Sequence, residues 1–286
     1  MSSDRLRYQR HHPCTTCQLR PVWTSRRSPE LRWMALLTIL LAWLIASDLR
    51  AEADATAVVD LLPLPGLFTP QASILFQGDS ITDGNRGRSA DPNHILGHGY
   101  QFIIAARFAE LHPEQHLTFS NRGVSGNRVV DLAKRWQADT LELKPDVLSI
   151  LIGINDFSHA PAGADHGPAE SYEHDYDALL TATLAALPGV RLVLGEPFLL
   201  PSGSYKDHYD ERLATLRSYQ EAVDRLGRKF HAPVIHYQRM FTAACRKAPA
   251  DYWIWDGVHP TYAGHGLMAD EWIRTVQAED AARLKP

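Results

Sequence analysis

Five short runs of apolar residues recur along the chain, and longer amphipathic stretches separate them. The runs are SILFQG (73–78), LTFSN (117–121), DVLSILIG (146–153), VRLVLGE (190–196) and PVIHY (233–237). Because they are almost continuously apolar rather than alternating, they are typical of strands buried on both faces of a parallel sheet. The intervening stretches predict helices at about 99–111, 128–142, 168–187, 207–230 and 260–277. The pattern predicts a three-layer α/β/α domain around a five-stranded parallel sheet.

The N-terminal part of the chain differs in charge from the rest. Residues 1–51 carry eight Arg, no Lys and three acidic residues, a net charge of +5, whereas the whole chain of 286 residues has −4, which leaves −9 for the remainder. The uncharged run WMALLTILLAWLIA (33–46) lies between Arg residues and the small residues Ala51, Ala53 and Ala55. This arrangement is typical of a secretory signal peptide. The run is shorter than the roughly 20 residues of a spanning helix, and an uncleaved anchor or translation from Met34 are the alternatives.

These features divide the chain into three parts. We expect a signal peptide or N-terminal anchor with a basic leader at 1–55, a Pro-rich lead-in at 56–72, and one enzyme-sized domain at 73–286. The first part predicts a secreted or periplasmic protein, with no membrane association beyond an anchor. The acidic remainder argues against nucleic-acid binding, which needs clustered Lys and Arg. Cysteine and histidine residues show no zinc spacing, so we assign no metal site to them, and the oligomeric state stays open.

Polar clusters follow the first three predicted strands and precede the last predicted helix. Asp79-Ser80 follow the first strand, NRGVSGN (121–127) follows the second, and GINDF (153–157) follows the third. WDGVHPTYAGH (255–265) precedes the last helix. Since ligands of open parallel sheets bind at the carboxyl ends of the strands, we expect these clusters to line one crevice.

The clusters contain the residue types that acyl transfer needs. A serine hydroxyl is a weak nucleophile that requires a histidine base, and that base requires a carboxylate to fix its tautomer. Ser80 is the predicted nucleophile, and the three-residue spacing of Asp256 and His259 lets the carboxylate and the base meet locally. Donors for the tetrahedral oxyanion are expected from the backbone N–H groups of Ser80 and Gly123 and from the Asn155 side-chain amide.

The four clusters together resemble the signature blocks of the SGNH, or GDSL, hydrolase superfamily. The matching residues are Gly78-Asp79-Ser80, Gly123 in NRGVSGN, Asn155 in GIND, and Asp256-x-x-His259 in DGVHP. The resemblance spans residues 73 to about 277 and implies a flavodoxin-like fold without metal or cofactor. It also implies a triad of Ser80, Asp256 and His259, with oxyanion donors at Ser80, Gly123 and Asn155. The surrounding text is most similar to bacterial acetylxylan and acetyl-xylooligosaccharide esterases, which implies removal of acetyl groups from sugar hydroxyls.

The sequence motifs indicate the type of reaction more closely than they indicate the substrate. Residues 157–170 and 197–208 form loops outside the motifs, and loops of this kind shape substrate pockets. A general short-chain esterase, lysophospholipase or arylesterase with the same triad therefore remains an alternative, as does a carbohydrate-binding module with an inactive hydrolase fold. Trp253 and Trp255 flank Asp256, and aromatic faces suit the apolar face of a sugar ring. We predict that both tryptophans bind an acetylated oligosaccharide or other small ester, with core packing as the alternative.

Overall fold

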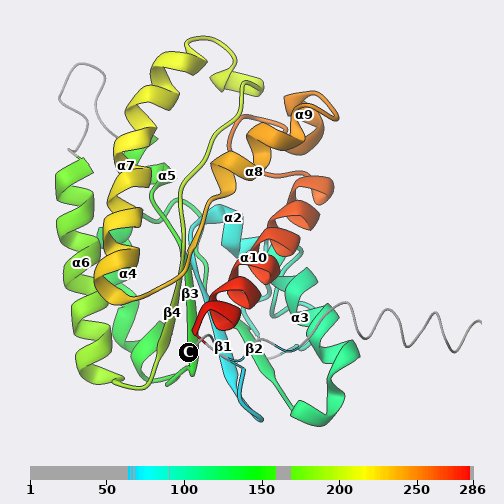
Figure 1. The fold of residues 1–286 in the computed structure, drawn as a ribbon, viewed down its shortest axis with the longest axis vertical. Helices are drawn as coiled ribbons and strands as arrows, with labels where there is room; N and C mark the ends of the chain where they lie inside the picture. The colour runs from blue at the N-terminus through cyan, green and yellow to red at the C-terminus, as the bar shows by residue number, and fades with distance from the viewer. Residues whose placement is uncertain (1–63, 65, 67, 90, 159–168, 284–286) are drawn as a thin grey trace, which may run out of the picture. The chain divides into compact units, whose positions relative to one another are not determined.

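A five-stranded parallel sheet forms the middle layer of the structure, which is a computed structural model (Figure 1). Its strands are β1 (Ser73–Gly78), β2 (Thr118–Asn121), β3 (Val147–Leu151), β4 (Arg191–Gly195) and β5 (Val234–Ile235). The spatial order is β2-β1-β3-β4-β5, and each neighbouring pair is parallel. Every residue of β3 is buried, as its apolar sequence predicts. The strand order and the flanking helices confirm the predicted three-layer, flavodoxin-like class.

Strand β5 is shorter than its sequence predicts. Residues 233–237 read as a strand, but only Val234 and Ile235 pair with β4. Tyr237 instead begins helix α8 (Tyr237–Ala244). Because β5 lies at the edge of the sheet, it has a neighbour on one side only, and the chain leaves the sheet once the pairing with β4 ends.

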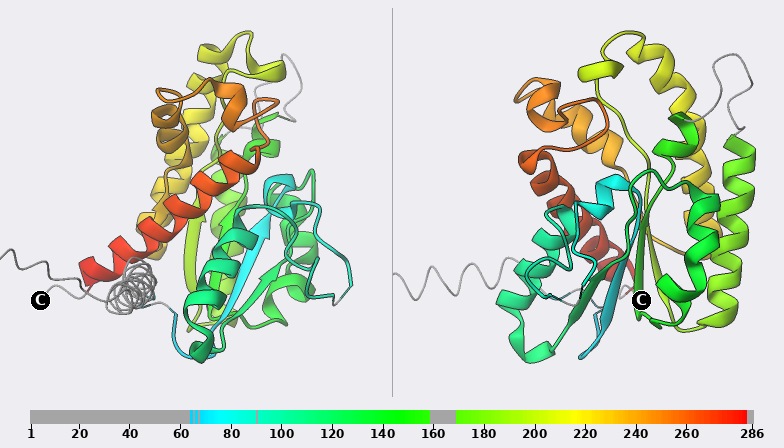
Figure 2. Two further views of the ribbon diagram at one scale, coloured as in Figure 1. Left: turned by 90° about the vertical axis from the view of Figure 1, so that its right-hand side faces the viewer. Right: turned by 180° about the vertical axis from the view of Figure 1, so that it is seen from behind.

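Helices cover both faces of the sheet. Figures 1 and 2 show α4 (Val129–Trp136), α6 (Ala169–Ala186) and α7 (Tyr209–Phe230) on one face, with α3 (Tyr100–Leu111) and α10 (Tyr262–Arg283) on the other. The helix expected at 128–142 divides into α4 and a π-helical turn, η2 (Gln137–Leu141). Short elements that sequence did not predict are α2 (Ser80–Asp83), η1 (Pro113–Gln115), α5 (Ile154–Ser158), η3 (Gly203–Tyr205), α8 and α9 (Ala250–Trp253).

Trp272 fixes the last helix to the sheet. Its side chain is fully buried, and its ring lies 5.8 Å from that of Phe76 on β1 between centroids. The indole Nε1–H donates to Ser149 Oγ on β3 at 2.9 Å, so the polar atom of this large side chain is satisfied inside the core. Because α10 follows directly after the segment that contains His259, this packing also determines where that segment lies.

The structure describes residues 64, 66, 68–89, 91–158 and 169–283. The predicted signal peptide or anchor at 1–55, most of the lead-in and most of the 157–170 loop fall outside these residues. Among the helices that are described, none has the length and apolar character required to cross a bilayer.

Candidate active site

Ser80 lies at the carboxyl end of β1, where the chain turns into the single-turn helix α2. Gly78 ends the strand, and a Cβ there would lie 2.3 Å from the Leu151 carbonyl of β3, so no larger residue fits. Asp79 caps α2 by accepting the Ile81 N–H at 3.0 Å. Ser80 is therefore the first residue of a helix, a position whose N–H has no partner within the helix.

Ser80, His259 and Asp256 form a continuous chain of hydrogen bonds. Ser80 Oγ lies 2.8 Å from His259 Nε2, and His259 Nδ1 lies 2.6 Å from Asp256 Oδ2. The other oxygen, Asp256 Oδ1, accepts the backbone N–H groups of His259 at 2.7 Å and Val258 at 3.0 Å. The structure thus brings the predicted nucleophile, base and carboxylate together, although 179 residues separate Ser80 from His259. This order of groups can activate a serine for acyl transfer.

The electrostatics keep Asp256 ionised. Partial burial alone would raise the pKa of its carboxyl, but the hydrogen bonds from the His259 backbone, the His259 ring and the Val258 backbone outweigh that effect and lower the pKa below its ordinary value. A carboxylate that remains charged at neutral pH can stabilise an imidazolium form of His259.

A short hairpin presents Asp256 and His259. Ile254 and Pro260 form an antiparallel bridge, and the Trp255 N–H donates to the His259 carbonyl at 3.2 Å. The loop after β4 supports the tip of this hairpin, since the Leu200 N–H donates to the Gly257 carbonyl at 3.0 Å. A Cβ on Gly203 would lie 2.5 Å from the Asp256 Cα, so the two segments pack backbone to backbone. The 197–208 loop, which sequence left unassigned, thus holds the triad carboxylate in place.

The loop after β2 does not present Gly123 as predicted. The Gly123 N–H donates to Asn121 Oδ1 at 2.8 Å, and Gly123 is buried against α2, where a Cβ would lie 2.4 Å from the Asp83 nitrogen. This hydrogen bond contradicts the predicted oxyanion role, because the N–H is already used and the glycine serves a close backbone contact. Gly126, three residues later, is exposed, has a φ of 81° and has open space where a side chain would be. No hydrogen bond to another described residue uses its N–H.

Asn155 lies beside the loop that contains Gly126. It belongs to α5, directly after β3, and its Nδ2 donates to the Asn127 carbonyl at 3.1 Å. This bond uses one of the two N–H groups of the amide and fixes the side chain next to residues 126 and 127. The carboxyl ends of β1, β2 and β3 therefore contribute Ser80, Gly126 and Asn155 to one region, as the rule for parallel sheets predicts.

Two carboxyl groups with buried oxygens, those of Asp79 and Asp156, are sequence neighbours of Ser80 and Asn155. Asp79 precedes Ser80 and Asp156 follows Asn155, and each uses one oxygen to accept a backbone N–H, from Ile81 and Val129 respectively. Their second oxygens have no partner among the described residues. Burial raises the pKa of Asp79 to about 7 and that of Asp156 to about 6. Both side chains hold backbone segments next to the site. Among the described residues, neither forms a hydrogen bond to His259.

The two predicted tryptophans have different surroundings. Trp253 is half-buried against the core, and its Nε1–H donates to the Ala248 carbonyl at 3.2 Å, which favours the packing alternative. Trp255 is 63% exposed. Its backbone N–H donates to the His259 carbonyl, so Trp255 and the triad histidine are neighbours across the hairpin.

Among the described residues, one group has ligand atoms close enough for a metal ion: Glu196, Asp224 and His236. His236 Nδ1 lies 3.1 Å from Glu196 Oε2 and 3.8 Å from Asp224 Oδ1. Glu196 Oε1 accepts the Gln238 N–H at the start of α8, and the hydrogen bond to Glu196 raises the pKa of His236. These contacts describe a hydrogen-bonded carboxylate–histidine pair at the start of α8, and the predicted absence of a metal or cofactor stays a prediction.

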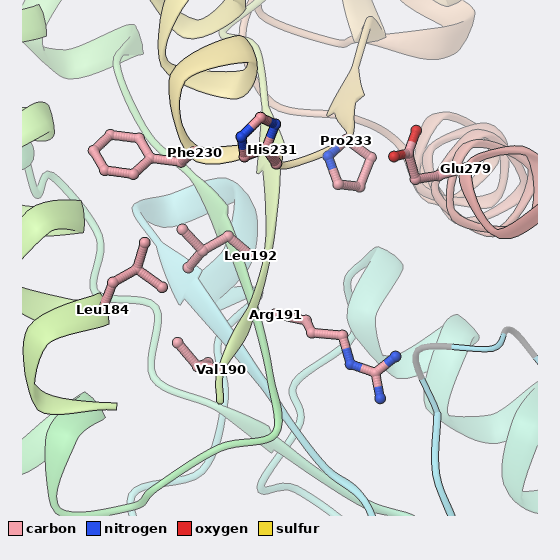
Figure 3. A pocket seen from close by; sticks show the side chains of 8 residues that line it. All are labelled: Leu184, Val190, Arg191, Leu192, Phe230, His231, Pro233 and Glu279. Atoms are coloured by element: carbon pink, nitrogen blue, oxygen red, sulfur yellow. The ribbon is translucent and has the colours of Figure 1, made fainter. Parts of the chain in front are cut away.

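A pocket of about 170 Å³ lies at the other end of the sheet (Figure 3). The residues that line it include Val190 and Arg191 at the start of β4 and Pro233 just before β5. Ligands of parallel sheets bind at the carboxyl ends of the strands, whereas this pocket is at the amino ends. None of the predicted site residues lines it.

Comparison with known proteins shows a family match. The model of the GDSL-like lipase/acylhydrolase family matches residues 76–267. An acetylxylan esterase of Geobacillus stearothermophilus is 30% identical over 212 residues, which are 72% of this chain and 94% of that protein.

Solved structures match over the same part of the chain. A protein described as a GDSL-like lipase from Parabacteroides merdae has 38% sequence identity and a TM-score of 0.69, covering 74% of this chain and 98% of that one. A catalytic mutant of the Geobacillus stearothermophilus acetylxylan esterase, with a serine replaced by alanine, has 29% identity and a TM-score of 0.64, covering 73% and 95%.

Proposed function

The chain belongs to the GDSL-like lipase/acylhydrolase family and is a carboxylic ester hydrolase, and we propose that it removes acetyl groups from acetylated carbohydrates through an acyl-enzyme on Ser80. The observation that carries the proposal is the chain of hydrogen bonds from Ser80 Oγ through the His259 ring to Asp256. This geometry supplies a nucleophile, a base and an orienting carboxylate.

The positions of these atoms support the following proposed reaction. Ser80 Oγ attacks the ester carbonyl carbon while His259 Nε2, 2.8 Å away, takes the hydroxyl proton. When the tetrahedral species collapses, the bond to the sugar oxygen breaks and His259 returns the proton to that oxygen, which leaves as a hydroxyl. A water molecule, deprotonated by His259, then attacks the acetyl-enzyme, and acetate leaves as Ser80 regains its proton. Asp256 holds the ring with Nε2 facing Ser80 throughout.

The tetrahedral species carries a negative oxygen that needs fixed donors. We assign the Ser80 N–H, the Gly126 N–H and the Asn155 side-chain amide to this role. Each comes from the carboxyl end of a different strand, and the bond from Asn155 to Asn127 holds the second and third donors side by side. Loss of one such donor in other enzymes lowers kcat by about 100- to 1000-fold.

The acetylated-sugar substrate rests on two supports. One is the similarity to an acetylxylan esterase over nearly the full length of that protein. The other is Trp255, an exposed aromatic residue whose backbone bonds to that of His259 and whose ring can stack on the apolar face of a sugar. Trp253 is omitted from the proposed substrate contacts because the core and the Ala248 carbonyl hold it.

The experiment is acetate release from acetylated xylo-oligosaccharides by the full chain, by Ser80→Ala and by Ser218→Ala. Ser218 is a matched control on α7 whose hydroxyl bonds to the Thr215 carbonyl. We expect acetate release from the parent and the control and near-complete loss in Ser80→Ala. If the parent cleaves 4-nitrophenyl acetate but releases no acetate from the oligosaccharide, the sugar substrate is wrong and the esterase remains. Faster cleavage of octanoyl than acetyl esters would favour a lipase or lysophospholipase.

We also propose that the protein is secreted or periplasmic. The support is the apolar run at 33–46, with its basic flank and its small residues at 51, 53 and 55. N-terminal sequencing of the protein recovered from the producing cells tests this, because a signal peptide predicts a mature start near residue 56 and an anchor predicts an intact leader in the membrane fraction.

A further inference from the structure

The carboxylate of Asp83 joins two segments of the site that are distant in sequence. Asp83 Oδ2 accepts both the N–H and the hydroxyl of Ser125, each at 3.1 Å. Arg88 binds the carboxylate from the other side, with Nη1 3.1 Å from Oδ1 and Nη2 2.8 Å from Oδ2. The Arg86 N–H also reaches Oδ1, at 3.2 Å. The side chain of Asp83 is buried, although Arg88 and Ser125 are exposed to solvent.

On one side, Asp83 is rigidly connected to the nucleophile. Both residues belong to the single turn of α2, in which the Asp83 N–H donates to the Asp79 carbonyl and the Gly84 N–H donates to the Ser80 carbonyl. Strand β1 and the Asp79 cap fix this turn at its start. The Asp83 carboxylate therefore has a defined position relative to the Ser80 N–H.

On the other side, Asp83 holds the residue that precedes Gly126. The start of the β2 loop is fixed by other contacts, such as the bond from Asn121 Nδ2 to the Thr82 carbonyl at 2.6 Å and that from Arg86 Nε to the Gly123 carbonyl at 2.9 Å. Ser125 and Gly126 are exposed beyond these contacts. Backbone bonds fix the residues on either side, since the Val124 N–H donates to the Gly78 carbonyl at 3.1 Å and the Asn127 N–H donates to the Val124 carbonyl at 3.2 Å. Between these two residues, Ser125 gives both its N–H and its hydroxyl to Asp83, so this carboxylate orients the peptide unit that carries the Gly126 N–H.

We propose that Asp83 is a positioning residue that sets the distance and angle between the oxyanion donors Ser80 N–H and Gly126 N–H, an inference that rests on the proposed esterase mechanism. Asp83 touches neither substrate nor triad. Its effect falls on the tetrahedral species, whose oxygen must meet both donors, and not on binding of the uncharged ester. The inference thus predicts a loss in kcat at unchanged KM.

The carboxylate suits this task because it stays ionised. Burial would raise the pKa of Asp83, but the hydrogen bonds from Arg88 and Ser125 outweigh burial and lower it. The two oxygens of this carboxylate accept five hydrogen bonds, two from Ser125, two from Arg88 and one from the Arg86 N–H. An asparagine can keep its single acceptor oxygen at the Oδ2 position and so retain both Ser125 bonds, whereas Asp83→Ala removes all five.

Asp146 provides a matched control. Its Oδ2 also accepts both the N–H and the hydroxyl of one serine, Ser73, at 2.8 and 2.9 Å. This pair lies at the start of β1 and β3, the opposite end of the sheet from Ser80. Asp146→Ala thus removes the same type of contact at a place where it cannot align oxyanion donors.

The experiment compares kcat and KM for 4-nitrophenyl acetate in the full chain, Asp83→Ala, Ser125→Ala and Asp146→Ala, with a thermal melt of each. We expect Asp83→Ala to lower kcat by about 10- to 100-fold at a KM within about twofold of the parent value, since a displaced donor loses much of its effect. Ser125→Ala, at an exposed position, removes one of the two bonds to Asp83 and lowers kcat by about 2- to 5-fold. Asp146→Ala keeps kcat within about twofold.

Other outcomes overturn the inference in distinguishable ways. If Asp83→Ala and Asp146→Ala lose kcat equally, in step with their melting temperatures, the role of Asp83 is only structural. If Asp83→Ala folds and keeps the parent kcat, or raises KM at constant kcat, the donors do not depend on it. Should Asp83→Ala fail to fold, a Ser125→Ala variant with unchanged kcat gives the same negative answer. A parent that cleaves no ester at all refutes the proposed function itself.

Discussion

Replacing Asp256 with asparagine tests whether this residue sets the tautomer of His259, because the backbone donors fix the orientation of the new amide. Asp256 Oδ1 accepts two backbone N–H groups, from His259 and Val258, and Oδ2 faces His259 Nδ1 at 2.6 Å. In Asp256→Asn, the two backbone donors hold the amide oxygen, so the NH₂ group faces Nδ1. The ring must then accept at Nδ1 and carry its proton on Nε2, the nitrogen that faces Ser80 Oγ. In that tautomer His259 cannot take the serine proton.

The size of the effect follows from the loss of the base. In a serine protease with the same arrangement of groups, this substitution lowers kcat by about 10,000-fold, which corresponds to about 5 kcal/mol of activation free energy. We expect a similar loss here, measured as kcat for 4-nitrophenyl acetate at neutral pH with the fold checked by circular dichroism. Asp251→Asn, an exposed carboxylate on the neighbouring helix α9, is the control and should keep kcat within about twofold. A loss below about tenfold in folded Asp256→Asn would refute the assigned tautomer.

Two further predictions concern a buried acid and an exposed ring. The pKa of Asp79 is raised from 3.8 to about 7 in the folded chain. Between pH 4 and 7 the folded state therefore keeps a proton that the unfolded state has lost. The free energy of unfolding falls as pH rises through this range, by up to about 4 kcal/mol. Asp79→Asn should reduce the fall in stability between pH 5 and 8 in urea unfolding and leave the part that Asp156, with a pKa raised to about 6, contributes; an unchanged fall would contradict the assignment. Trp255→Ala should raise KM for acetylated xylo-oligosaccharides by about tenfold, roughly 1.4 kcal/mol, and change KM for 4-nitrophenyl acetate much less, whereas equal changes would argue against a sugar contact.

The parts of the fold that sequence predicts are those that burial alone determines. Strand β3 is buried on both faces, so its apolar run marks its extent to within two residues of the observed bounds. Strand β5 is an edge strand, and nothing local distinguishes its last paired residue from Tyr237, where α8 begins. The helix expected at 128–142 shows a continuous helical pattern, and the change from α-helical to π-helical hydrogen bonding within it has no clear sequence signal.

Sequence likewise predicts some residues of the candidate site and not others. Ser80, His259 and Asp256 are predictable because the strand rule and the three-residue spacing bring them together. The loop NRGVSGN contains two glycines, and the sequence cannot show that Asn121 takes the Gly123 N–H while Gly126 adopts a positive φ. These facts depend on the path of the backbone, which the residue types permit but do not specify.

The alignment of Ser80 with His259 depends on elements far from both. Ser80 is fixed by β1 and α2, while His259 lies on a hairpin that the loop after β4 supports from one side and α10 continues on the other. The 2.8 Å distance between Ser80 Oγ and His259 Nε2 therefore depends on two segments that are held in place by different contacts. The bond from Trp272 to Ser149 of β3 connects α10 to the middle of the same sheet that carries Ser80. Because proton transfer fails when the two atoms move apart by about 1 Å, the buried contacts of α10 with the sheet contribute to catalysis as well as to stability.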